Sequence, residues 1–162
     1  MKTEKERMSG SSQPKEKRRP RLLVVDDDRL LSAILQANLE HKGYNIILAS
    51  SVLAAVQQMR LQRPDLIVLD VVLPGTSGFY WCQRLKADPD TRDIPVLMIS
   101  GSTVGEQALE AGADAFLPKP IDIRALLAKI RELLKLRSQK QGWSGINASA
   151  VKGINVAGRR NP

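Results

Sequence analysis

Hydrophobic positions alternate between two patterns along the central part of the chain. Continuous apolar runs, typical of buried parallel strands, occur at 21–26, 45–49, 65–70, 95–100 and 115–117. Between these runs apolar residues recur at helical spacing, and Gly43 and Pro64 end the first two helical segments. The pattern predicts five strands alternating with five helices, the last of which ends by Arg137.

Each predicted helix has an apolar stripe, a capping residue or both. In the first helix the stripe consists of Leu31, Ile34, Leu35 and Leu39. Asp28, Ser50 or Ser51, and Asp122 are placed to cap helix starts, and Asp65 reads as a turn or cap residue. Only residues 104–111 can be helical between the last two strands, so that helix is expected to be short.

A chain that alternates strands and helices in this way forms right-handed crossovers, which predicts an α/β sandwich of three layers. Such a sheet binds ligands beyond the carboxyl ends of its strands. Four of the five predicted strands end at polar residues, whereas the second ends in Ala49. If the second strand lies at the edge and the order is 2-1-3-4-5, these four polar ends are neighbours.

The polar residues at these ends suit one kind of chemistry. Asp26, Asp27 and Asp28 follow the first strand, Asp70 ends the third, Ser100 ends the fourth and Lys119 follows the fifth. Clustered carboxylates repel one another unless a cation neutralises them, and oxygen ligands of this type favour Mg²⁺. Ionised Asp70 would then attack a phosphoryl group, while Lys119 and Ser100 would hold phosphate oxygens. The pattern predicts a phosphoryl-accepting pocket.

Four segments closely resemble the receiver domain of two-component response regulators: LLVVDDD (22–28), LIVLDVVLPGTSG (66–78), PVLMIS (95–100) and GADAFLPKP (112–120). The resemblance covers about residues 21–137 and implies a flavodoxin-like (βα)5 sandwich with a parallel five-stranded sheet. It implies that Asp70 is the phosphoacceptor. It also implies that Asp26 and Asp27 hold Mg²⁺ together with Asp70 and the backbone carbonyl of Val72.

The same resemblance implies roles for residues in the second half of the domain. Ser100 resembles the switch hydroxyl that moves onto the phosphate, and Lys119 resembles the family's lysine. The bond between Lys119 and Pro120 resembles the family's cis peptide, and Phe116 resembles the aromatic switch whose rotamer follows phosphorylation. The stretch from Ser100 to Lys119 is shorter than is usual in the family, which again indicates a short fourth helix.

The distribution of charge divides the chain into three parts. Residues 1–20 hold seven basic and three acidic side chains, residues 138–162 hold four basic and none acidic, and residues 21–137 hold fourteen of each. We therefore expect a receiver domain over 21–137, after a disordered basic tail (1–20). The polar, basic segment 138–162 is expected to be disordered or to act as a docking segment. A basic face that reads a nucleic-acid sequence is not expected.

Other features of the sequence favour a cytoplasmic protein without a membrane partner. The chain has no apolar run of the ~18–20 residues that span a bilayer, and its charged start lacks the apolar stretch of a secretory signal. The resemblance implies a phosphorelay response regulator that catalyses only its own phosphorylation and dephosphorylation. Because His41 is the single histidine, the donor is expected to be an external histidine kinase or histidine phosphotransfer protein.

The expected output is docking to an unknown downstream protein, as a monomer or a weak phosphorylation-dependent dimer, without a DNA-binding domain of its own. Three other interpretations remain open. The chain is a pseudo-receiver with an inactive site, or the front part of a transcription factor. The third alternative is a haloacid-dehalogenase-type phosphatase, which would use the Asp26-x-Asp28 pair. Leu30 counts against it, because that family has Thr or Val at this position.

Overall fold

A computed structural model of the chain describes residues 18–101 and 103–150, the last nine by their backbone alone. Five parallel strands form the main sheet: β1 (Arg21–Val25), β2 (Asn45–Ala49), β3 (Leu66–Asp70), β6 (Val96–Ser100) and β7 (Ala115–Pro118). Their order, β2-β1-β3-β6-β7, confirms the predicted 2-1-3-4-5 arrangement. The labels shift because a small antiparallel hairpin, β4 (Val72–Leu73) and β5 (Thr76–Ser77), forms between β3 and the next helix, where we predicted no strand.

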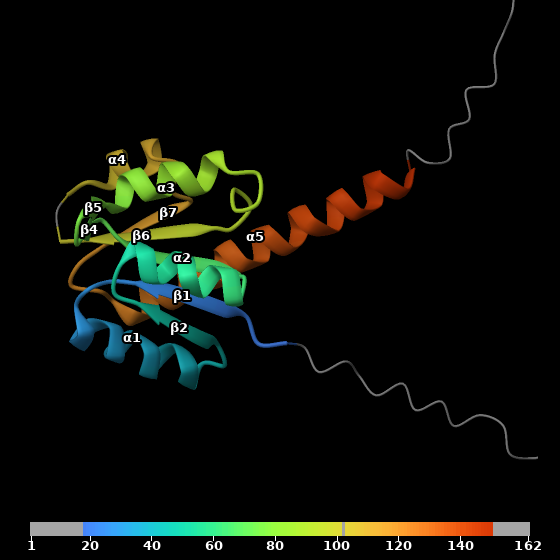
Figure 1. Ribbon diagram of the computed structural model, residues 1–162. Coiled ribbons are helices and arrows are strands. Elements are labelled where there is room, and N and C mark those ends of the chain that lie inside the picture. The colour runs from blue at the N-terminus through green and yellow to red at the C-terminus, as the bar shows by residue number, and fades with distance from the viewer. Residues whose placement is uncertain (1–17, 102, 151–162) are drawn as a thin grey trace, which may run out of the picture.

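Helices cover both faces of this sheet (Figure 1). One core joins the sheet to α1 (Arg29–His41) and α5 (Ile123–Ala150), and the other joins it to α2 (Val52–Leu61), α3 (Gly78–Ala87) and α4 (Gly105–Glu110). Successive side chains of a strand point to opposite faces, so Leu22 belongs to the first core and Leu23 to the second. Strands buried on both sides explain the continuous apolar runs, and the predicted three-layer sandwich is confirmed.

The predicted helix starts are confirmed at three positions. The side chain of Asp28 accepts hydrogen bonds from two backbone N–H groups of α1, Ser51 caps α2, and Asp122 caps α5. The short helix predicted between the last two strands is α4, which has six residues. In α1, Ile34 belongs to the predicted apolar stripe but is 45% exposed. It lies at the border of an apolar stripe that is centred on Leu35 and Leu39, both fully buried.

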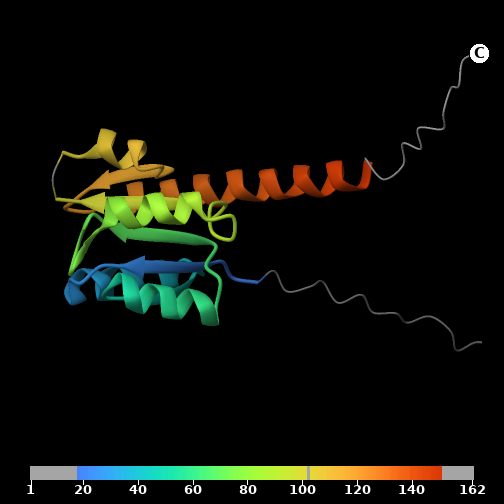
Figure 2. The same cartoon turned by 45° about the horizontal axis from the view of Figure 1, so that its top comes forward.

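The last helix is longer than we predicted, because α5 continues past Arg137 to Ala150. The next four residues contain no proline, glycine or β-branched side chain, and extending an existing helix avoids the cost of nucleation. Figure 2 shows α5 running beyond the sheet as one continuous helix. No helix in the described part of the chain is long and apolar enough to cross a membrane. The remainder of the two predicted tails, 1–17 and 151–162, lies outside the described residues.

Asp65, which we predicted to be a turn or cap residue, joins three distant segments instead. Its carboxylate accepts a hydrogen bond from the backbone N–H of Arg21 at 2.8 Å and pairs with Arg18 and Arg137, each at 3.0 Å. Arg137 also donates to the Asp65 carbonyl at 2.7 Å. The entry to β1, the start of β3 and helix α5 are thereby tied together. These contacts begin at Arg18, inside the segment that we assigned to the disordered tail.

Asp65→Asn should lower the free energy of unfolding by roughly 2 kcal/mol at neutral pH, since it removes hydrogen bonds to charged groups at a largely buried position. Burial alone would raise the pKa of Asp65, but the hydrogen bond from Arg21 and the charges of Arg18 and Arg137 outweigh it and hold the pKa below its usual value. A carboxylate of lowered pKa stabilises the fold above the unfolded-state pKa of about 4. That contribution is lost as the pH falls through the folded-state pKa.

Urea unfolding at neutral pH and at about pH 3 tests this expectation. The difference in unfolding free energy between wild type and Asp65→Asn should be roughly 2 kcal/mol at neutral pH and smaller at about pH 3. Asp93→Asn, at an exposed position, is the matched control and should change stability by less than about 0.5 kcal/mol at both pH values. A difference for Asp65→Asn that does not change with pH would contradict the assignment of the stability to its charge.

Candidate functional site

Three carboxylates meet beyond the carboxyl ends of two neighbouring strands. Asp26 and Asp27 follow β1, and Asp70 is the last residue of β3. The parallel register pairs Val25 with Leu69, which brings the residues that follow to the same level. One carboxylate oxygen from each aspartate lies within 4.8 Å of those of the other two. Asp26 and Asp70 are buried while Asp27 is exposed, so the cluster is accessible from the side of Asp27.

Hydrogen bonds and a lysine fix the two buried carboxylates. One oxygen of Asp26 accepts a hydrogen bond from the backbone N–H of Asp28 at 2.8 Å, and the other accepts one from Lys119 Nζ at 2.9 Å. The same Nζ atom lies 3.3 Å from Oδ2 of Asp70. The backbone N–H of Lys119 donates to the carbonyl of Ser100 at 2.7 Å, and the bond between Lys119 and Pro120 is cis. Lys119 therefore bridges carboxylates from two other strands.

The charges in this cluster do not balance. Burial raises the pKa of Asp70, the neighbouring charge of Asp26 raises it further, and Lys119 acts in the opposite direction. Burial alone would lower the pKa of Lys119, but its hydrogen bond to Asp26 and the charges of Asp26 and Asp70 outweigh that effect and raise it. With three carboxylates and one ammonium, the ionised cluster has an excess of negative charge. Carboxylate oxygens are hard ligands, so this donor set suits a divalent cation such as Mg²⁺.

The other predicted site residues surround this cluster at different distances. Ser100 ends β6, the strand beside β3, and is 1% exposed. Val72 follows Asp70 closely, and its backbone N–H donates to Asp70 Oδ1 at 3.4 Å, while its side chain is exposed. Phe116 lies on β7 and is partly buried, with its ring against Gly105 at the start of α4. The structure thus joins Asp26 and Asp70 through Lys119, places the Asp27 carboxylate near them, and sets Ser100 at the adjacent strand end.

Gly78 is part of the support of this site, which the sequence did not reveal. It is the first residue of α3, and its backbone N–H donates to the carbonyl of Val71 at 2.7 Å. A Cβ atom at this position would lie 2.2 Å from the backbone oxygen of Asp70. The start of α3 therefore packs directly against the peptide of Asp70. Within the segment LIVLDVVLPGTSG (66–78), no sequence signal separated this glycine from an ordinary turn residue.

Known proteins are similar to this chain over most of its length. The family model of the response regulator receiver domain matches residues 22–131, which include the whole acidic cluster and Lys119. The DNA-binding dual master transcriptional regulator RpaA of Synechocystis sp. is 42% identical over 122 residues, which make up 72% of this chain and 49% of that protein. The response regulator MprA of Mycobacterium sp. is 39% identical over 125 residues, covering 75% of this chain and 54% of that protein. The chain spans about half the length of the curated relatives it matches.

Solved structures agree in fold. A response regulator from Chloroflexus aurantiacus J-10-fl is 33% identical with a TM-score of 0.70, and the match covers 73% of this chain and 99% of that one. A CheY-like response regulator receiver domain protein from Methanospirillum hungatei JF-1 is 27% identical with a TM-score of 0.70, covering 76% of this chain and 99% of that one. In both comparisons nearly the whole of the solved chain has a counterpart in this one.

Proposed function

The chain belongs to the response regulator receiver domain family, and on that basis we propose that it accepts a phosphoryl group on Asp70 from a phosphohistidine partner. The observation that carries this proposal is the position of Lys119. Its Nζ atom lies 2.9 Å from Asp26 and 3.3 Å from Asp70, which sets a compact positive charge beside the oxygen where an acyl phosphate would form.

Ionised Asp70 acts as the nucleophile in this proposal. Its carboxylate oxygen forms a bond to phosphorus while the P–N bond of the donor breaks, and the electron pair of that bond stays on the imidazole nitrogen. Lys119 then holds one phosphate oxygen and the hydroxyl of Ser100 holds another. Asp26, Asp27, Asp70 and the carbonyl of Val72 would hold Mg²⁺, which supplies positive charge for the carboxylates and the phosphate.

The output follows from where these groups lie in the fold. Movement of Ser100 onto the phosphate changes the end of β6, and Phe116 on the neighbouring strand β7 reorients with it. A histidine kinase or a histidine phosphotransfer protein is the proposed donor. Because residues 21–137 hold as many acidic as basic side chains, the proposed target of this part is a protein and not a nucleic acid. The only catalysis proposed is that of the chain's own phosphorylation and dephosphorylation.

Incubation of the full chain with acetyl phosphate and Mg²⁺ tests the function. The intact mass should increase by one phosphoryl group, and chelation of the metal with EDTA should prevent the increase. Incubation with a phosphorylated histidine phosphotransfer protein provides a second donor. No increase with either donor would favour a pseudo-receiver, in which the same fold binds partners without accepting phosphate.

A thermal unfolding experiment tests the metal site separately. Mg²⁺ should stabilise the wild type, by about 2.7 kcal/mol at a concentration 100 times its dissociation constant, and should stabilise Asp27→Asn much less. Asp27 is exposed, so the substitution removes a ligand without disturbing the core. Without metal, Asp27→Asn should be at least as stable as the wild type, since one repelling charge is gone. Asp93→Asn is the matched control. If Mg²⁺ stabilised the wild type, Asp27→Asn and Asp93→Asn equally, the proposed magnesium site would be contradicted.

A further inference from the structure

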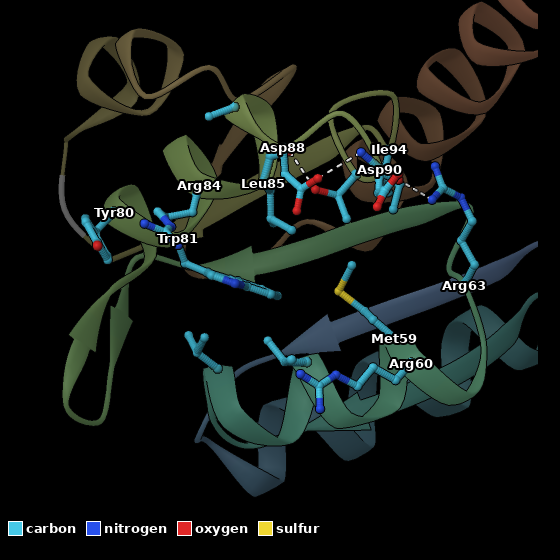
Figure 3. Close-up of a pocket in the computed structure, with 14 residues that line it drawn as sticks. Met59, Arg60, Arg63, Tyr80, Trp81, Arg84, Leu85, Asp88, Asp90 and Ile94 are labelled. Atoms are coloured by element: carbon cyan, nitrogen blue, oxygen red, sulfur yellow. Dashed lines mark hydrogen bonds between the residues drawn. The ribbon is translucent and has the colours of Figure 1, made fainter.

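A groove of about 890 Å³ lies between α2 and α3, lined by residues outside the acidic cluster. Its floor is apolar and consists of Val52, Val56 and Met59 from α2, Trp81 and Leu85 from α3, and Ile94. Figure 3 shows the side chains of Met59 and Trp81 pointing into the space between the two helices. The volume is within the range of about 300–1,000 Å³ that is usual for ligand pockets, which is ample for several side chains of a partner.

Exposed arginines stand on both walls of this groove. Arg60 comes from α2 and Arg84 from α3, and Figure 3 shows them on opposite sides of the Trp81 side chain. A third arginine, Arg63, donates to the backbone carbonyl of Asp90 at one end of the groove. There the carboxylate of Asp88 accepts a hydrogen bond from the N–H of Asp90 at 2.9 Å. The groove thus has a basic stretch around Trp81 and an acidic end at the loop after α3.

We propose that the groove between α2 and α3 docks an acidic amphipathic helix of a partner protein. The apolar face of that helix packs on Met59 and Trp81, and its carboxylates pair with Arg60 and Arg84. Trp, Met and Arg are the side chains that protein interfaces favour at their centres. An elongated groove between two helices matches the single apolar face that an amphipathic helix offers.

Charge distinguishes this occupant from the alternatives within the chain. Residues 138–162 contain four basic and no acidic side chains, and residues 1–20 contain seven basic and three acidic ones, so either segment would bring positive charge to the arginines. A second copy related by a two-fold axis would bring the same lining of three arginines and two aspartates, so both surfaces would carry a net positive charge. An acidic partner alone gives complementary charge at Arg60 and Arg84.

The proposal is tested with a synthetic, fluorescein-labelled amphipathic peptide that carries leucines on one helical face and glutamates beside them. A second peptide has lysine in place of each glutamate and the same apolar face. Fluorescence anisotropy with the full chain should show binding of the acidic peptide only, weakening as salt is raised. The double variant R60E/R84E should lower its affinity about tenfold or more, because two attractions become repulsions.

Two controls make the result specific. The double variant R124E/R131E changes two exposed arginines of α5, on the other face of the sheet, and should bind the acidic peptide like the wild type. If R60E/R84E does not fold, the single variant Arg84→Gln replaces it. In an NMR titration of the wild type, the amide signals that shift should belong to α2, α3 and the segments that follow them in the groove lining, residues 52–63 and 78–94.

Several outcomes would overturn the proposal. These are equal binding of the two peptides, unchanged affinity in R60E/R84E, amide shifts confined to other elements, or no binding of the acidic peptide. None of these outcomes depends on Asp70, because the experiment uses the unphosphorylated chain. Failure of the docking site and failure of the phosphoacceptor function are therefore distinguished.

Discussion

Asp70→Asn should abolish the increase in mass by one phosphoryl group that acetyl phosphate and Mg²⁺ give the wild-type chain. Asparagine has nearly the same shape as aspartate, so it fits a side-chain site that is almost fully buried, but it has no ionised oxygen to attack phosphorus. Lys119 would still contact Asp26, so the rest of the cluster is kept. Intact mass spectrometry of both proteins under the same conditions measures the effect, which is expected to be complete loss.

Stability measurements separate this loss of function from loss of fold. Burial and the charge of Asp26 raise the pKa of Asp70 in the folded chain, so the folded state binds this proton more tightly than the unfolded state does. Ionised Asp70 therefore costs stability, a cost that is absent below the unfolded-state pKa and grows as pH rises through the folded-state pKa. Without metal at neutral pH, Asp70→Asn should unfold at the same or higher urea concentration than the wild type.

The same mass measurement on Asp93→Asn provides the control. This exposed carboxylate lies outside the cluster, so its loss should leave the phosphoryl gain unchanged. An equal gain in Asp70→Asn and in the wild type would place the acceptor on another residue. Hydroxylamine, which cleaves acyl phosphates, should return the phosphorylated wild type to its original mass.

The acidic cluster was predictable because two adjacent strands provide it. Parallel strands buried on both faces leave continuous apolar runs in the sequence, and polar residues mark the ends of four of the five runs. Once the sheet order is known, Asp26 and Asp70 must be neighbours, since β1 and β3 are paired. Lys119 is different, because β6 separates its strand from β3 and only the length of its side chain brings Nζ to the carboxylates. Its predicted place in the site depended on the assumed strand order and was then supported by the resemblance to the family.

Features that depend on contacts between distant side chains were not predictable. Asp65 and Arg137 are 72 positions apart, and nothing near either residue indicates their pairing. The helix end at Ala150 was also missed, because the apolar stripe stops near Leu134 while helical hydrogen bonding continues without it. A stripe reports where a helix packs on the core. It does not report how far a helix extends beyond the core.

Gly78→Ala should lower the free energy of unfolding by about 3 kcal/mol, at the upper end of the usual cost of overpacking a well-packed site. The added methyl group would lie 2.2 Å from the backbone oxygen of Asp70 and 2.9 Å from the Cα atom of Val71. Both neighbours are backbone atoms, which cannot rotate away as the end of a side chain can. Alanine's advantage in helices, about 1 kcal/mol over glycine, is too small to offset this clash.

The clash also connects stability with function. If α3 moves to make room for the methyl group, the peptide between Asp70 and Val71 moves with it, and the carboxylate shifts relative to Lys119. Phosphorylation of Gly78→Ala by acetyl phosphate should therefore be slower than that of the wild type, by about 100-fold for a displacement near 1 Å. The rate is measured at a temperature where the variant remains folded, as judged by circular dichroism.

Gly101→Ala is the matched control, because Gly101 is a second glycine beside the site and directly follows Ser100 at the end of β6. Apart from Gly101 and its chain neighbours, no atom of the described residues lies within 4 Å of the position that its Cβ would take. Its unfolding free energy should stay within about 0.5 kcal/mol of the wild type. If Gly78→Ala and Gly101→Ala proved equally stable, the start of α3 would not be held against Asp70. If Gly78→Ala were destabilised but phosphorylated at the wild-type rate, the packing of α3 would support the fold without positioning the acceptor.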